Sequence, residues 1–229
     1  THKAFRGSIC RKAFDAMTGS RLERAEDSYE FLVLASMSNL EVTNTDIRGY
    51  VYNIGRGVTT DNMLSPDKFL MSASQIKSCW EEAKHFADST ESVLVKESAT
   101  RLKERLTFTL MNEWKDRVSD NDKIEAAKSV APIIGEVETA TALMRFARDG
   151  AYASIEYLNP STSAFLDWAA LAEELTQDVH VLPVSYTQMK DAASRHIQEF
   201  KETQDLHKRQ KKQTVKIFVS AHKLVSTFS

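Results

Sequence analysis

Apolar residues recur at steps of three and four positions along most of the chain, and this spacing places them on one face of an α-helix. The pattern covers about residues 2–17 and about residues 21–37. Gly19 follows the first stretch and Ser38-Asn39 follows the second, and residues of these types often end helices. The sequence therefore predicts two helices near its start.

Helix-start signals divide the middle of the chain. Ser65-Pro66-Asp67 offers a capping residue followed by proline at the first helical position, and residues 72–75 have the form of a capping box. An apolar stripe then runs from Ile76 to Ala87. A long helix is predicted from near residues 89–91 to Trp114, and at 1.5 Å per residue it would span about 35–40 Å.

Further helices are expected in the second half of the chain. A short helix ends near Val130, and Pro132 in a first turn opens the next one, which ends near Gly150. Ser or Thr at residues 161–163 caps another helix. A second long helix begins near Ser185.

The apolar stripe of this second long helix stops at Phe200. Leu206 is the only apolar residue in the polar run 201–213, and apolar character returns from Ile217 onward. A helix that is polar on all sides has nothing to bury within its own chain. It therefore projects into solvent or meets a partner.

The segment 46–58 departs from the helical pattern. It holds three of the seven glycines, and Tyr50, Tyr52 and Ile54 alternate as in a short strand. The predicted fold class is consequently all-α: a multi-helix globular domain with two long helices and at most a minor β segment near residues 48–58. One domain over residues 1–229 is expected, and the alternative is two helical subdomains with a seam near residues 119–121.

Composition narrows the class of protein. Apolar residues make up 42% and charged residues 27%, a balance typical of a globular chain, and no apolar run is long enough to span a bilayer. The first residues lack both an initiator methionine and the apolar core of a secretory signal, which indicates a fragment or a processed form. Two cysteines are too few for a disulfide framework, so a reducing, cytoplasmic location is expected.

Charge is distributed unevenly along the chain. Residues 1–24 form a basic N-terminal segment of charge +4, and residues 201–229 form a basic C-terminal extension of charge +5. The total is −2, so the residues between them carry −11. Basic ends can meet an anionic ligand or the acidic body of a second copy, so a homo-oligomer is expected. The alternative is solvated helix faces that happen to differ in sign.

The spacing of potential metal ligands and nucleophiles indicates no catalytic, metal or cofactor site. Glu81, Glu82 and His85 lie within one helical turn, but a di-iron bundle needs a second such group, which is absent from the sequence. Cys10 and Cys79 fall on apolar stripes, where a thiol usually packs in the core. We also expect three tryptophans to anchor the core: Trp80, Trp114 and Trp168.

The sequence also lacks the motif of a nucleotide-binding site. The pair Gly55 and Gly57 lacks the further residues of a dinucleotide or phosphate-binding loop. No cofactor and no small-molecule ligand are therefore predicted.

Two groups of residues suit single-stranded nucleic acid. Arginines that pair with phosphates and rings that stack on bases occur together between residues 48 and 56, and a cluster of cations follows residue 207. The candidate nucleic-acid-binding residues are Arg48, Tyr50, Tyr52, Arg56, Lys208, Arg209, Lys211 and Lys212. The competing interpretations are a structural loop with buried tyrosines and a solvated helix end.

These patterns favour a non-enzymatic, self-associating structural protein that binds nucleic acid, in the manner of a helical coat protein or nucleoprotein. A cytosolic helical adaptor for protein partners is the first alternative. A small-ligand enzyme is the second, because acid–base catalysis can leave no linear motif. A deep pocket lined by two or more charged residues would favour that enzyme.

Overall fold

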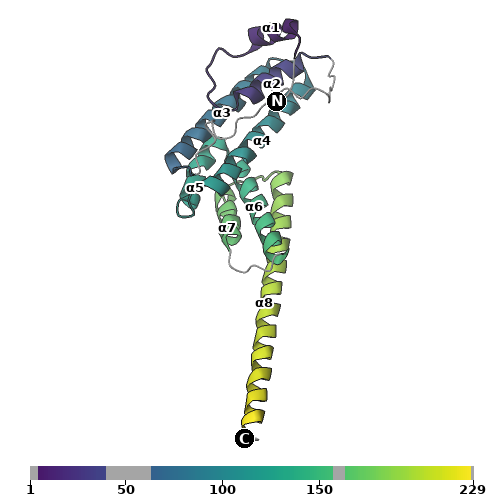
Figure 1. Cartoon of the computed structure of the whole chain (residues 1–229). Coiled ribbons are helices and arrows are strands. Elements are labelled where there is room, and N and C mark those ends of the chain that lie inside the picture. The colour runs from purple at the N-terminus through teal and green to yellow at the C-terminus, as the bar shows by residue number, and fades with distance from the viewer. Residues whose placement is uncertain (1–4, 40–62, 157–162, 228–229) are drawn as a thin grey trace, which may run out of the picture. The chain divides into compact units, whose positions relative to one another are not determined.

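The regular structure of the chain is helical throughout its described parts. The computed structural model describes residues 5–39, 63–156 and 163–227, and the side chains of the last segment up to residue 214. These residues form eight α-helices and no strand (Figure 1). The all-α prediction is confirmed, whereas the minor β segment expected near residues 48–58 lies outside the described residues.

The chain divides into two compact units, residues 1–139 and residues 140–229. The predicted seam near residues 119–121 lies inside the first unit. The division itself falls within one helix, α6 (Glu136–Glu156).

The first unit is built around its third helix. It contains α1 (Gly7–Ala16), α2 (Glu26–Ser36), α3 (Pro66–Asp88), α4 (Val93–Arg117) and α5 (Lys123–Ile134). α3 packs against α2, α4 and α5, and α1 packs on α2. Phe69, Ile76 and Trp114 are fully or almost fully buried between these helices. The indole Nε1 of Trp114 donates a hydrogen bond of 2.8 Å to the carbonyl of Lys123, so this large ring is buried without losing its polar partner.

Two of the predicted helix starts can be compared directly with the structure. Ser65 caps α3, because its Oγ accepts a hydrogen bond from the Lys68 amide at 3.4 Å, and Pro66 occupies the first turn as predicted. The capping box predicted at residues 72–75 is wrong, because those residues lie inside α3 and Ser72 is buried. The long helix α4 starts after Ser92, which caps it through the Val95 amide.

The break between α5 and α6 comes from a glycine and not from the proline. α5 continues through Pro132 to Ile134, and Gly135 follows with a φ of 117°. Residues with side chains rarely adopt this backbone conformation, so glycine ends the helix here. Pro132 is tolerated because it removes a donor only two residues before that end. The prediction that Pro132 opens the next helix is therefore wrong.

The second unit packs the rest of α6 with α7 (Ala164–Thr176) and α8 (Val184–Thr227). The ring of Phe165 meets that of Phe200 edge-to-face with centroids 5.0 Å apart. Tyr186 is fully buried, and its hydroxyl shares a hydrogen bond of 2.9 Å with that of Thr176. These contacts attach the first half of α8 to the unit.

α8 is the longest helix of the chain. Its 44 residues correspond to about 66 Å at 1.5 Å per residue, and Figure 1 shows it continuing well beyond α6 and α7. The expected start near Ser185 is confirmed. α4 has 25 residues as predicted for a long helix, and α3 and α6 also exceed 20 residues.

Gly150 permits close contact between α6 and α7. It lies within α6 and not at its end as predicted, and an added Cβ would lie 3.0 Å from the Cβ of Phe165. Gly150→Ala should lower the free energy of unfolding by about 1 kcal/mol, because crowding outweighs the gain in helix propensity. Gly150→Leu should lower it further, as measured by urea denaturation.

Gly7→Ala is the matched control for this substitution. In the first turn of α1 the nearest atom to an added Cβ is the flexible Arg11 Nη1 at 3.7 Å. An unchanged or raised stability is expected for Gly7→Ala. A stabilising Gly150→Ala would show that the close helix contact does not exist.

Candidate functional site

Five exposed cations lie on the part of α8 that buries nothing apolar. We refer to residues 201–214 as the basic stretch; it has a net charge of +3, and its one apolar residue, Leu206, is 57% exposed. Its cations are Lys201, Lys208, Arg209, Lys211 and Lys212, and all are exposed. Lys208 Nζ lies 3.9 Å from Asp205 Oδ1, and because both groups are exposed this pair holds the lysine only weakly. The cations are therefore accessible to a ligand.

The helical geometry brings the predicted cations together. At about 100° per residue, Lys208, Lys211, Lys212 and Arg209 occupy an arc of about 160°. Lys208 and Lys211 also line a recess of about 400 Å³ along α8, together with Phe200 and Ser154. Uncharged Gln210 lines the same recess, and Gln213 lies outside the arc of the four cations. One side of the basic stretch thus concentrates its positive charge.

The other predicted nucleic-acid contacts cannot be placed beside these cations. Arg48, Tyr50, Tyr52 and Arg56 lie outside the described residues. The basic stretch itself contains no Phe, Tyr or Trp. It therefore offers charge for phosphates, and the imidazole of His207 is its one ring on which a base could stack.

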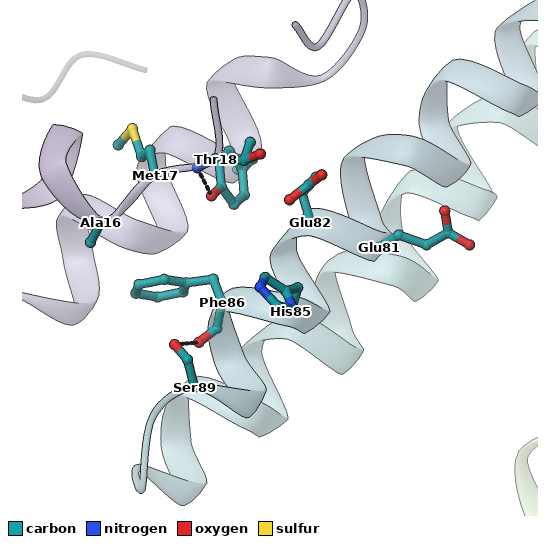
Figure 2. Close-up of a pocket in the computed structure, with 9 residues that line it drawn as sticks. Ala16, Met17, Thr18, Glu81, Glu82, His85, Phe86 and Ser89 are labelled. Atoms are coloured by element: carbon teal, nitrogen blue, oxygen red, sulfur yellow. Dashed lines mark hydrogen bonds between the residues drawn. The ribbon is translucent and has the colours of Figure 1, made fainter. Parts of the chain in front are cut away.

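A second candidate site is a pocket of about 550 Å³ in the first unit, which we call the acidic pocket (Figure 2). Its lining residues come from the end of α1, from α2 and from the last turns of α3: Ala16, Met17, Thr18, Tyr29, Glu81, Glu82, His85, Phe86 and Ser89. Figure 2 shows Glu82 and Phe86 on the side of α3 that faces Met17 and Thr18. Carboxylates and apolar groups therefore share one cavity.

Two further polar groups at this site are held neutral. Burial raises the pKa of Tyr29, and the nearby Glu82 carboxylate raises it further. The Tyr29 hydroxyl accepts a hydrogen bond of 2.9 Å from the Thr18 amide, which fixes the chain after α1. Burial raises the pKa of Cys79 to about 11, with smaller contributions from Asp27 and Glu26. The carboxylates of the pocket are those of Glu81 and Glu82.

Sequence reasoning found the acidic residues of this pocket but not the pocket itself. Glu81, Glu82 and His85 are neighbours on α3, so they could be read from the sequence as one group. Tyr29 and Met17 reach them only through tertiary packing. Among the residues that the structure describes, no three His, Cys, Asp or Glu side chains are grouped so that they could hold a metal ion.

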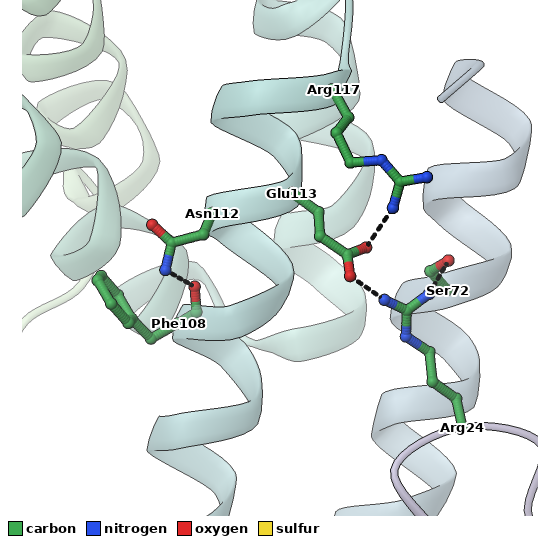
Figure 3. A network of polar contacts seen from close by, with 6 residues as sticks. All are labelled: Arg24, Ser72, Phe108, Asn112, Glu113 and Arg117. Atoms are coloured by element: carbon green, nitrogen blue, oxygen red, sulfur yellow. Dashed lines mark hydrogen bonds and ion pairs between the residues drawn. The ribbon is translucent and has the colours of Figure 1, made fainter. Parts of the chain in front are cut away.

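A third polar cluster connects the segment before α2 to α3 and α4 (Figure 3). Arg24 donates hydrogen bonds to Ser72 Oγ at 2.8 Å and to Glu113 Oε1. Arg117 Nη1 lies 3.9 Å from the other oxygen of Glu113. The side chains of Arg24, Glu113 and Arg117 are at most 24% exposed, so water screens their charges little. This cluster holds the N-terminal helices on the unit.

Arg24 and Arg21 provide a matched test of that attachment. Arg24→Ala should lower the free energy of unfolding by about 2 kcal/mol, because it leaves Glu113 largely buried without its closest cation. The Arg21 side chain is 88% exposed and lies 3.9 Å from Glu23, so Arg21→Ala should cost less than about 0.5 kcal/mol. Equal losses in urea denaturation would contradict the structural role of Arg24.

The buried thiol gives a test by chemical labelling. With a pKa of about 11, about one Cys79 side chain in a thousand is a thiolate at pH 8, so labelling should be confined to the partly exposed Cys10. Cys10→Ser should therefore leave almost no rapid reaction with a disulfide reagent until the protein is unfolded. The folded pKa of Cys79 exceeds the ordinary value of 9.0, so the unfolded chain loses the thiol proton at a lower pH than the folded protein does. The free energy of unfolding should therefore decline as pH rises from 9 to 11. Rapid labelling of native Cys10→Ser would contradict the burial of Cys79.

Comparisons with known proteins leave function to be argued from geometry. No protein-family model, curated protein or solved structure matches this chain. Within the described residues, every helix is too short or too polar to cross a lipid bilayer.

Proposed function

We propose that this protein is a non-enzymatic structural protein that self-associates and binds nucleic acid through the basic stretch of α8. The observation that carries the proposal is the exposure of Lys208, Arg209, Lys211 and Lys212 on a helix that extends past the contacts of its own unit. A row of cations on a helix neutralises phosphates and releases counterions, which favours binding. Two free cysteines fit a reducing, cytoplasmic environment.

The basic stretch is proposed to contact the sugar-phosphate backbone of the nucleic acid. Because the basic stretch has five cations and no Phe, Tyr or Trp, it contacts mainly phosphate charge and does not distinguish the bases. Binding through this helix is thus independent of sequence and strongly dependent on salt. Such binding suits a protein that covers nucleic acid, as a coat protein or nucleoprotein does.

A small-ligand enzyme is the second candidate, and the acidic pocket is the observation that favours it. Catalytic electrostatics are strongest where water is excluded and the charged groups are held in place. Here Glu81 and His85 are exposed and Glu82 is only half-buried. The pocket therefore fits a docking surface better than a site that excludes water from a reaction.

Replacing the four cations tests the proposed nucleic-acid interface. The variant Lys208→Gln, Arg209→Gln, Lys211→Gln, Lys212→Gln should lose most affinity for a fluorescent single-stranded oligonucleotide. Each phosphate contact contributes about −0.7 to the slope of log affinity against log salt, so losing four contacts should flatten the slope by about 3. Fluorescence anisotropy at salt concentrations from about 50 to 200 mM measures both the affinity and its dependence on salt.

The matched control removes the same charge elsewhere. Lys77, Lys84, Lys96 and Arg101 lie outside the basic stretch on α3 and α4, and their replacement by Gln should leave the salt slope unchanged. Equal effects of the two variants would mean that net charge alone governs binding. Absence of binding by the original chain at low salt would reject the nucleic-acid function and favour the adaptor.

A further inference from the structure

We infer that the acidic pocket is a docking site for the basic stretch of α8 from a second copy of this chain. The inference deepens the self-association part of the proposed function and names the two surfaces that meet. It does not depend on nucleic-acid binding.

The charge around the acidic pocket favours a cationic partner. Glu81 and Glu82 line the pocket, and Glu26 and Asp27 at the start of α2 are exposed and lie near enough to Cys79 to influence its thiol. Lys77 is a counter-charge to Glu81, because its Nζ lies 3.8 Å from Glu81 Oε1. Both groups of that pair are about half exposed, so the attraction is weak and readily exchanged for another cation.

The shape and apolar content of the pocket fit long basic side chains in particular. A lysine or arginine has a hydrocarbon stem and a charged tip, and the stem packs on apolar surface while the tip reaches a charge. Met17 and Phe86 supply the apolar surface, and Glu82 lies on the same side of α3. A volume of about 550 Å³ is within the range of about 300–1,000 Å³ that is usual for ligand pockets.

The basic stretch has the complementary features. Lys208 is three residues from Lys211 and four from Lys212, so their side chains lie on neighbouring turns with Cβ atoms about 5–6 Å apart. Two or more of these side chains can therefore enter one cavity together.

Joining these two surfaces produces a head-to-tail contact. The pocket belongs to the first unit of one copy and the helix to the second unit of another, so a pair joined by one contact has a free helix on one copy and a free pocket on the other. Such a heterologous contact continues from copy to copy and forms a ring or an open chain. Two copies that dock reciprocally form the smallest such ring, and copies joined by single contacts form longer assemblies.

Charge reversal on each surface tests the contact in the full chain. The pocket variant is Glu81→Lys, Glu82→Lys and the helix variant is Lys208→Glu, Lys211→Glu. Each variant alone should weaken self-association by on the order of tenfold in sedimentation velocity, because like charges then face each other. Glu97→Lys, Glu104→Lys on the exposed face of α4 is the matched control for net charge and should associate like the original chain.

Mixing the two variants distinguishes docking from damage to the fold. The reversed pocket attracts the reversed helix, and the unchanged pocket and helix still attract each other, so the mixture should associate more strongly than either variant alone. A single chain that carries all four substitutions should also recover association. Failure of both the mixture and the four-substitution chain to associate would overturn the inference.

Oligonucleotide binding separates this result from the proposed nucleic-acid function. The pocket variant keeps every cation of the basic stretch, so it should still bind the single-stranded oligonucleotide while losing self-association. Recovery by the mixture supports the docking site even when the original chain binds no oligonucleotide. An original chain that stays monomeric at all concentrations and salts overturns the docking site, whatever its affinity for nucleic acid.

Discussion

The first unit depends on the burial of α3 against three other helices. Its apolar residues recur at helical spacing over 23 residues, and each side of the helix meets a different partner. Phe69, Ala73 and Ile76 enter the core, while the same helix supplies Ser72 to the Arg24 cluster and Glu82 to the acidic pocket. The positions of the Arg24 cluster and of the acidic pocket are therefore set by the apolar packing of one helix.

Positive charge gathers on α8 in the second unit and negative charge at the acidic pocket in the first, because apolar packing leaves these surfaces out of the cores. Residues that bury nothing apolar remain free to carry charge without a cost in folding, and the basic stretch uses this freedom. In the first unit, Glu81 and Glu82 line a cavity together with the buried Tyr29, whose hydroxyl stays neutral. Two surfaces of opposite sign thus form on one chain, each supported by its own core.

Helix type and several boundaries could be predicted from the sequence because they depend on neighbouring residues. Ser65-Pro66 begins α3 through one side-chain cap and a fixed proline φ, both of which are local. Pro132 misled the prediction because Gly135, three residues later, adopts the positive φ that ends α5. The exposure of the basic stretch could also be predicted from the sequence, because Leu206 is its one apolar residue.

The acidic pocket and the Arg24 cluster could not be predicted in the same way. Tyr29 and Glu82 are far apart in sequence, as are Arg24 and Glu113, and only packing of helices brings them together. Short-range spacing contains no information about such pairs. Ser72 illustrates the ambiguity, because a serine that resembles a cap is instead a buried acceptor for an arginine.

The unsupported part of α8 has a consequence for the order of its backbone. Helix nucleation is costly whereas propagation is nearly neutral, so the packed turns around Tyr186 and Phe200 act as the template from which the exposed turns grow. Beyond that template, up to residue 214, the turns depend on intrinsic helix propensity and on pairs within the helix such as Lys208 and Asp205. The basic stretch lies next to the template, so the helical order of its cations is inherited from the packed turns of the unit.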